Sequence, residues 1–239
     1  MRIPGVVAPL LAAAALLTAC NPADAQKAQA ILTQAQQASQ ALSSESFIMK
    51  MTFSFEGKSA EIDMQGGAYV HGGRTGDLYL TMTGSIPDAS FPLNMTIVKR
   101  GATVTMRTNG QTQTVPVGAA EQQFGGSLNG ITQLMDFARY VKGGSVTETD
   151  FQGRAADKLV GILDTQGLVS SAGGVSSKVF GQLGVHLGDV RVVLYVPHDT
   201  HLVEAMIADL TISAAGHSAS MMMSLAVTGV NQPLTFPSL

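Results

Sequence analysis

Apolar and polar side chains alternate along residues 46–55, SFIMKMTFSF. One parity holds only large apolar residues, namely Phe47, Met49, Met51, Phe53 and Phe55, whereas the other parity is polar except for Ile48. A period of two residues is typical of a β-strand with one apolar and one mostly polar face. Because the same alternation recurs toward the end of the chain, it predicts one large sheet with a single apolar side.

Further alternating segments follow, separated by short turns that are rich in glycine, proline and asparagine. We expect strands at residues 59–69, 75–84, 93–99, 102–108, 112–117, 145–151, 155–163, 188–196, 201–213 and 218–230. Asn109-Gly110 and Gln152-Gly153 are predicted to form tight hairpin turns. Pro116 cannot donate a hydrogen bond to a neighbouring strand, so the segment 112–117 is predicted to lie at an edge of the sheet.

A helical period is found in four segments, at residues 26–43, 119–124, 128–141 and 165–183. Gly143-Gly144 are expected to end the third helix, and Gly173-Gly174 to break the fourth. Three or four helices and about eleven strands, without a second zone of composition, predict a single α+β domain. We expect a large antiparallel sheet that is strongly curved into a half-barrel, with the helices packed on its concave side.

The chain begins with a short apolar segment that is not expected to belong to the fold. Residues 6–17 follow Arg2 and are too few to span a bilayer as a permanent helix. They lead into Leu17-Thr18-Ala19-Cys20, which resembles a bacterial lipobox. The resemblance implies cleavage before Cys20 and attachment of a diacylglycerol to its sulfur. Cys20 is also the only cysteine of the chain, so it has no partner for a disulfide.

This interpretation divides the chain into a lipoprotein signal peptide at residues 1–19, a lipidated tether at 20–26 and a lipid-binding half-barrel domain at 27–239. Two or three acyl chains anchor a protein stably to a bilayer. We therefore expect an exported domain that is held by lipid at the outer face of the cytoplasmic membrane, in the periplasm or cell-wall space. The formal net charge of −3 gives no electrostatic reason to expect nucleic acid as a partner.

Methionine is unusually frequent among the expected strand residues, since all 12 except Met1 and Met135 lie in predicted strands. Methionine is unbranched and adaptable, so a methionine-rich face suits ligands of variable shape, although a loosely specified core would look the same. About eleven strands present more apolar area than three or four modest helices can cover, which predicts an elongated cavity for acyl chains. The residues expected to line it are Phe47, Met49, Met51, Phe53, Ile62, Met64, Leu80, Met82, Met95, Met106, Leu134, Val179, Leu194, Met206, Met221 and Met223.

Two longer stretches carry a resemblance to a known family. Residues 137–162, FARYVKGGSVTETDFQGRAADKLVGI, consist of a helix end and then Gly-Arg before a strand. Residues 193–209, VLYVPHDTHLVEAMIAD, join a strand, a polar turn and the start of a second strand. With the lipobox and the order of elements, the chain resembles the LppX/LprA/LprF/LprG family of actinobacterial lipoproteins over essentially its whole mature length. The resemblance implies a half-barrel like that of LolA, closed by helices.

The same resemblance implies a function in lipid handling. It implies binding of multi-acylated lipids or glycolipids and their delivery across the cell envelope, often with a membrane exporter. It implies no catalytic residue and no cofactor, apart from bound lipid and the diacylglycerol on Cys20. The alternative is an envelope adaptor or sensor that uses the same fold to bind a protein segment or a signal lipid. The segments 86–92 and 165–183 are the candidates for a gate that admits acyl chains.

Other chemistry has little support in the sequence. His198 and His201 flank a predicted turn, but only Asp199 and Glu204 lie nearby, so we do not expect a metal site. The motif GHSAS at residues 216–220 leads into a strand, which is not the strand-to-helix turn of a nucleophile elbow. We therefore predict a protein without enzymatic activity.

Overall fold

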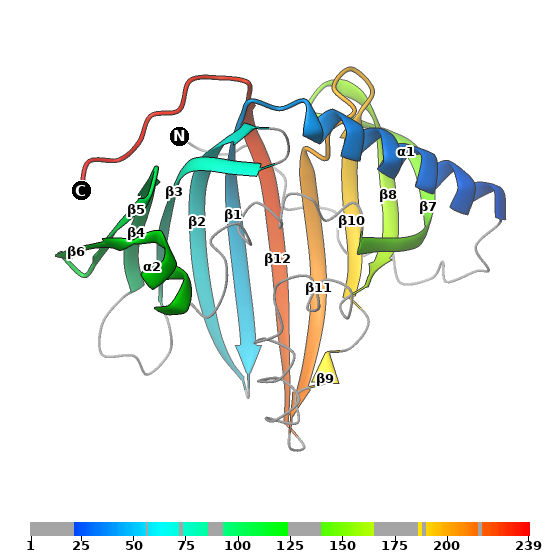
Figure 1. Cartoon of the computed structure of the whole chain (residues 1–239). Helices are drawn as coiled ribbons and strands as arrows, with labels where there is room; N and C mark the ends of the chain where they lie inside the picture. The colour runs from blue at the N-terminus through cyan, green and yellow to red at the C-terminus, as the bar shows by residue number, and fades with distance from the viewer. Residues whose placement is uncertain are drawn as a thin grey trace.

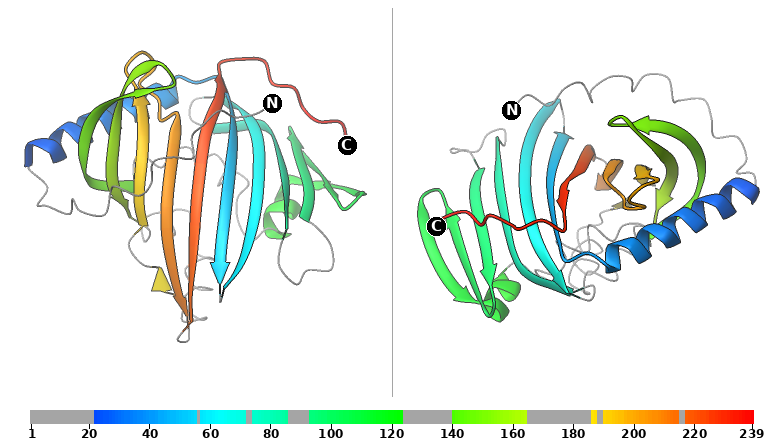
Figure 2. Two further views of the ribbon diagram at one scale, coloured as in Figure 1. Left: turned by 180° about the vertical axis from the view of Figure 1, so that it is seen from behind. Right: turned by 90° about the horizontal axis from the view of Figure 1, so that it is seen from above.

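The computed structural model describes residues 22–55, 57–71, 74–85, 93–123, 140–164, 186–187, 190–214 and 217–239. Their main feature is a large, curved, open antiparallel sheet (Figures 1 and 2). Its strands are β1 (Ser44–Phe55), β2 (Lys58–His71), β3 (Arg74–Ser85), β4 (Leu93–Arg100), β5 (Thr103–Thr108), β6 (Gln111–Pro116), β7 (Val141–Phe151), β8 (Arg154–Leu163), β9 (His186–Leu187), β10 (Val190–Pro197), β11 (Ala205–Ala214) and β12 (His217–Val230). The described helices are α1 (Pro22–Gln40) and α2 (Val117–Gln123).

The strands follow the order β6-β5-β4-β3-β2-β1-β12-β11-β10-β8-β7, and the short strand β9 pairs with β11 outside this path. Most neighbours are also consecutive in the chain, as expected for hairpins. The main exception is β1, which pairs with β12, the last strand of the chain, and so joins the early and the late strands in one sheet. The predicted fold class, a single α+β domain built on an open antiparallel half-barrel, is confirmed.

One apolar register row crosses most of the sheet. Successive pairings bring one residue from each of nine strands into line: Val146, Leu159, Leu194, Met206, Leu225, Met49, Met64, Met82 and Met95. Side chains that are directly opposite in register point to the same face of a sheet. The alternation predicted from sequence therefore continues from strand to strand as a single apolar face.

Helix α1 packs on this apolar face at the end that holds β7. Its residues Ala28, Ile31 and Leu32 are buried in the same cluster as Leu159 and Val192 of the sheet. In Figure 1 the helix passes in front of β10, β8 and β7. The helix predicted at residues 26–43 is thus confirmed, and its buried residues cover one end of the sheet.

The start of α1 differs from the prediction. The helix begins at Pro22 instead of residue 26, so most of the segment predicted as a tether is helical. Proline is favoured in the first turn of a helix because its fixed φ suits the helix and its missing N–H is not needed there. Asp24, also in the first turn, has the charge that favours this end of the helix.

Sharp turns join several strands as predicted. Asn109 and Gly110 have φ values of 48° and 85°, and Gln152 and Gly153 have values of 55° and 79°. Two successive positive φ values are typical of the hairpin turns that match the twist of a sheet. The prediction of an edge strand is also confirmed, because β6, which ends at Pro116, lies at one edge of the sheet, with β5 as its neighbour.

Gly143-Gly144 were predicted to end a helix, and this prediction is wrong. Strand β7 already begins at Val141, and its register with β8 shifts between Lys142 and Ser145. The two glycines have φ values of 64° and 141°, so they form a bulge that other residues would adopt only with strain. Residues 128–139 of that predicted helix, and residues 165–183 with the 86–92 loop, lie outside the described residues.

The predicted strand 201–213 begins later than expected, at Ala205. Residues before it form a turn in which the His201 N–H donates to the Pro197 carbonyl over 2.9 Å and the Glu204 N–H donates to the Tyr195 carbonyl over 3.0 Å. His201 itself has a φ of 53°, which is incompatible with a strand. The two-residue strand β9, which was not predicted, pairs with β11.

Candidate functional site

The apolar concave face is the candidate site, and fourteen of the predicted lining residues lie on it. Buried members are Phe47, Met49, Leu80, Met106, Leu194, Met206 and Met223. Partly buried members are Met51, Phe53, Ile62, Met64, Met82, Met95 and Met221. Leu134 and Val179, like the predicted lipidation site Cys20, lie outside the described residues. The shared face is observed, whereas the role of these residues in lining a lipid cavity stays a prediction.

Parallel register rows place these side chains side by side. Met51 is flanked by Ile62 and Met223, and Phe53 is opposite Met221. A third row runs from Met106 through Ile97 and Leu80 to Gly66, which pairs with Phe47. The site is therefore a continuous apolar surface that spans many strands and does not depend on any single residue.

The burial of this face changes from one side of the sheet to the other. We call β8, β10 and β11 the aliphatic half, because its centre holds Leu159, Leu194 and Val192, all with 0% exposure. We call β1 to β4 the methionine half, because Met49, Met64, Met82 and Met95 lie in one register row across it. Of these four methionines only Met49 is buried, and the others keep partial exposure.

Gly66 makes room for the aromatic ring of Phe47. A Cβ at this position would lie 2.7 Å from Cζ of Phe47 and 2.9 Å from the backbone oxygen of Tyr79. The Phe47 ring therefore lies directly over the backbone of β2. Sequence reasoning treated this glycine as an ordinary strand residue, whereas the structure shows that it determines where Phe47 sits.

Glu45 is a buried acidic residue of this face that the sequence interpretation missed. It lies two residues before Phe47, so the alternation of β1 places it on the apolar face, where it pairs with buried Ala68. The residue is 6% exposed, and burial raises the pKa of its carboxyl from 4.5 to about 7. Extending the alternating stretch by one residue would have revealed this acidic residue on the apolar parity.

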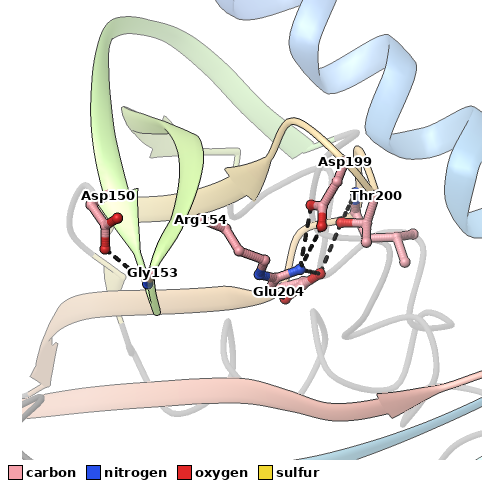
Figure 3. Close-up of polar contacts among 7 residues, drawn as sticks. Asp150, Gly153, Arg154, Asp199, Thr200 and Glu204 are labelled. Atoms are coloured by element: carbon pink, nitrogen blue, oxygen red, sulfur yellow. Dashed lines mark hydrogen bonds and ion pairs between the residues drawn. The ribbon is translucent and has the colours of Figure 1, made fainter.

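A cluster of charged residues joins the two stretches that carried the family resemblance. Arg154, at the start of β8, donates two hydrogen bonds to the carboxylate of Glu204, and its guanidinium also lies 3.3 Å from both oxygens of Asp199 (Figure 3). Thr200 donates to Glu204 over 2.8 Å. Hydrogen bonding to Glu204 is the main cause that raises the pKa of Arg154. The cluster holds the turn before β11 against the β7–β8 hairpin, which is a structural role.

The histidines of that turn are not assembled into a metal site. Nε2 of His198 lies 3.2 Å from Oδ2 of Asp157, which is an ion pair when the histidine is protonated. Over the described parts of the chain, no three His, Cys, Asp or Glu side chains are grouped so that they could hold a metal ion. His217 and Ser220 of the GHSAS motif both lie within β12.

The C-terminal residues 231–239 pack on the opposite, convex face of the methionine half. The Leu234 N–H donates to the Tyr69 hydroxyl over 3.1 Å. The Phe236 ring stacks on Tyr69, meets Tyr79 edge to face and lies 5.1 Å from the Arg100 guanidinium carbon. Tyr79 points away from the methionines because its neighbours Leu78 and Leu80 face the concave side. The tail thus supports the methionine half from behind.

Neither of the two described helices, α1 and α2, combines the length and the apolar character that a helix needs to cross a bilayer.

Comparison with known proteins supports the fold and leaves the function open. No family model matches the chain, and no curated protein matches its sequence. Among solved structures, LprF from Mycobacterium bovis matches with a TM-score of 0.53 and 12% identity, over 89% of this chain and 97% of that chain. The Mycobacterium tuberculosis lipoprotein LppX matches with a TM-score of 0.48 and 12% identity, over 89% of this chain and 99% of that chain. The similarity to LprF confirms the fold that the family resemblance implied.

Proposed function

We propose that this protein is an exported lipoprotein, acylated at Cys20, that binds acylated lipids or glycolipids and carries them across the cell envelope. The observation that carries this proposal is the apolar register row across nine strands, whose methionine end stays partly exposed. A fold similar to that of LprF is consistent with the proposal. The acyl chains would lie against the concave face, with the cell membrane and an exporter as further partners.

The energetics of transfer suit a methionine-rich surface. Burying one acyl CH₂ group out of water is worth about 0.8 kcal/mol, so two acyl chains would approach the limit of non-covalent affinity if they came from water. The lipid comes instead from a bilayer, which is already apolar. The protein therefore needs to match the membrane and must also be able to release its ligand. Unbranched methionine side chains can adapt to acyl chains of different shapes without demanding one of them.

The methionine half is the part of the face that can accept such a ligand. Leu159 and Leu194 of the aliphatic half have no exposed surface left to cover. Met64, Met82 and Met95 are partly exposed and lie in one row across neighbouring strands. A row that crosses strands at intervals of about 4.8 Å offers an extended apolar track.

The proposal is tested by native mass spectrometry of the acylated protein, purified from a bacterial host that attaches lipid to lipobox cysteines. We expect a bound lipid whose occupancy falls at least several-fold in the double variant Met64→Gln, Met82→Gln. The matched control is Met222→Gln, because Met222 is 43% exposed and lies on the opposite face, next to buried Met223. Circular dichroism shows whether each variant is folded.

Two other outcomes contradict the proposal, the first in its function and the second in the place where it puts the acyl chains. If the wild-type protein carries no lipid and instead retains a periplasmic protein segment, the adaptor function is correct. If lipid is present but the wild type, the double variant and Met222→Gln all keep it equally, the methionine half is not where acyl chains bind.

A further inference from the structure

Helix α1 begins almost at the predicted anchor. Only Asn21 separates Cys20 from Pro22, the first residue of the helix. A residue spans at most about 3.6 Å, so two residues reach roughly 7 Å. If Cys20 holds its acyl chains in a bilayer, the first turn of α1 cannot lie far from the lipid headgroups.

The helix is also attached to the sheet from its second turn to its end. Near its start, Nζ of Lys27 lies 3.8 Å from carboxylate oxygens of Glu148 in β7 and Asp157 in β8. Just after its end, the amide of Ser43 donates to Oδ1 of Asn231 over 2.8 Å, and the Ser43 hydroxyl donates to the same oxygen over 3.0 Å. Between these ends, its apolar stripe is buried against the sheet. The anchor therefore restrains the whole domain, because α1 has no freedom to act as a hinge.

From these two observations we infer that the protein presents a defined end to the bilayer. The membrane-facing surface consists of the first turns of α1 together with the outer side of β7 and β8. The edge formed by β4, β5 and β6 faces away from the membrane. This orientation rests on the acylation of Cys20 that the proposed function includes, and it adds the side of the domain that the membrane contacts.

The chemistry of α1 fits a surface of lipid headgroups. Its outward side carries Gln29, Ala30, Thr33, Gln34, Gln37 and Gln40, and residues 28–44 contain no charged residue. The surface placed against the bilayer combines this uncharged side with Asp24 and Lys27 of the first turns and Glu148 of β7, so charges of both signs meet the headgroups there. The large exposed apolar side chains of the described regions are Ile162, Met222 and Leu239, none of which belongs to α1. The helix should therefore rest on the headgroups without entering the acyl region.

The orientation also separates the two halves of the concave face. The start of α1 lies beyond β7, on the side of the molecule opposite to β6 (Figure 1). Ten strand spacings of about 4.8 Å separate β7 from β6, which is about 48 Å along the curved sheet. The aliphatic half is therefore the part near the membrane, and the methionine half is the part that points into the envelope.

Fluorescence quenching tests this orientation with one introduced cysteine at a time, since acylation consumes the thiol of Cys20. Thr147→Cys in β7 and Thr112→Cys in β6 are a matched pair, because both residues are exposed on strands at opposite edges of the sheet. Each acylated variant is labelled with an environment-sensitive dye and placed in phosphatidylcholine vesicles containing phosphatidylglycerol and a headgroup-attached quencher. We expect quenching at position 147 to exceed quenching at 112 at least threefold.

An insertion variant decides whether the short tether causes the difference. Inserting a flexible Gly-Ser segment of about 12 residues between Asn21 and Pro22 should make the two positions equal, because the domain can then rotate freely. Equal quenching without the insertion overturns the orientation, while bound lipid in the mass spectrum would still support the proposed function. Protein that does not attach to the vesicles at all overturns the anchor and the orientation together.

Discussion

The two halves of the concave face share one sheet and one register row, yet they are built from different side chains. Leu159, Leu194 and Val192 of the aliphatic half are completely buried. Met64, Met82 and Met95 of the methionine half are only partly so. Branched side chains have few rotamers and specify a single packing, whereas methionine adapts to its neighbours. The contrast is what the proposed function requires, with one half that maintains the fold and another whose side chains keep surface for a ligand.

The two halves are also covered by different segments, which lie on opposite faces of the sheet. The aliphatic half is covered by α1 on its concave side. The methionine half receives the C-terminal tail on its convex side, where Phe236 packs against Tyr69 and Tyr79. The C-terminal tail can therefore stabilise the methionine half from its convex face, while the methionines on the concave face stay partly exposed. The following predictions use variants in each half to test this division.

The largest expected difference comes from truncating one side chain in each half. Leu194→Ala should lower the free energy of unfolding by about 3–5 kcal/mol, because it removes buried methyl groups and leaves a cavity. Met82→Ala should cost about 1 kcal/mol, because its side chain is only partly buried and its neighbours can adapt. Urea unfolding followed by circular dichroism measures both values, since the chain has no tryptophan. Equal costs would mean that both halves are ordinary core.

The next largest expected effect is a pH-dependent change in the free energy of unfolding, and it comes from Glu45. Its carboxyl has a pKa of about 7 in the folded protein against 4.5 in the unfolded chain, so the folded state retains a proton that the unfolded state loses. The contribution of this proton to the free energy of unfolding is fully present below pH 4.5, and it is lost as the pH rises through 7. The shift corresponds to about 3 kcal/mol. Compared with Glu45→Gln, the wild-type protein should therefore lose about this much stability between pH 4 and pH 8.

The control for this measurement is Glu61→Gln. Glu61 is exposed and pairs with Lys50 over 3.0 Å, and an exposed ion pair contributes little to the free energy of unfolding. If the stability difference between wild type and Glu45→Gln stays constant from pH 4 to pH 8, Glu45 is not buried as an uncompensated carboxyl. The apolar face would then tolerate a charge at this position.

Much of the sheet could be predicted from sequence because its signals are local. The alternation of residues 46–55 determines which side chains share a face, and turn residues such as Asn109-Gly110 determine where a hairpin closes. Fourteen candidate site residues were placed on one face by the same parity argument. Local patterns also explain the error at Gly143-Gly144, because a glycine pair can equally end a helix or form a bulge.

Other features could not be predicted because they depend on distant contacts. The pairing of β1 with β12 joins the first and the last strand in chain order. The C-terminal residues show no periodicity, and their partner Tyr69 lies 165 positions away from Leu234. The cluster of Arg154, Asp199 and Glu204 likewise forms only when β8 and the turn before β11 meet. Each of these features requires the folded sheet before the contact exists.

The smallest expected effect comes from substituting two glycines of the concave face, Gly66 in the methionine half and Gly161 in the aliphatic half. A Cβ at Gly66 would lie 2.7 Å from Cζ of Phe47, and a Cβ at Gly161 would lie 2.6 Å from Cγ1 of Val141. Val141 is 4% exposed and β-branched, so it has little freedom to move away. Phe47 is 5% exposed, and a Cβ at Gly66 would also lie 2.9 Å from the backbone oxygen of Tyr79, which can move only if the β3 backbone shifts. We therefore expect Gly161→Ala and Gly66→Ala to cost about the same, roughly 2 kcal/mol each, in the same urea experiment. A clearly larger cost at Gly66 would show that the methionine half is packed more rigidly than the aliphatic half, which is incompatible with an adaptable binding surface.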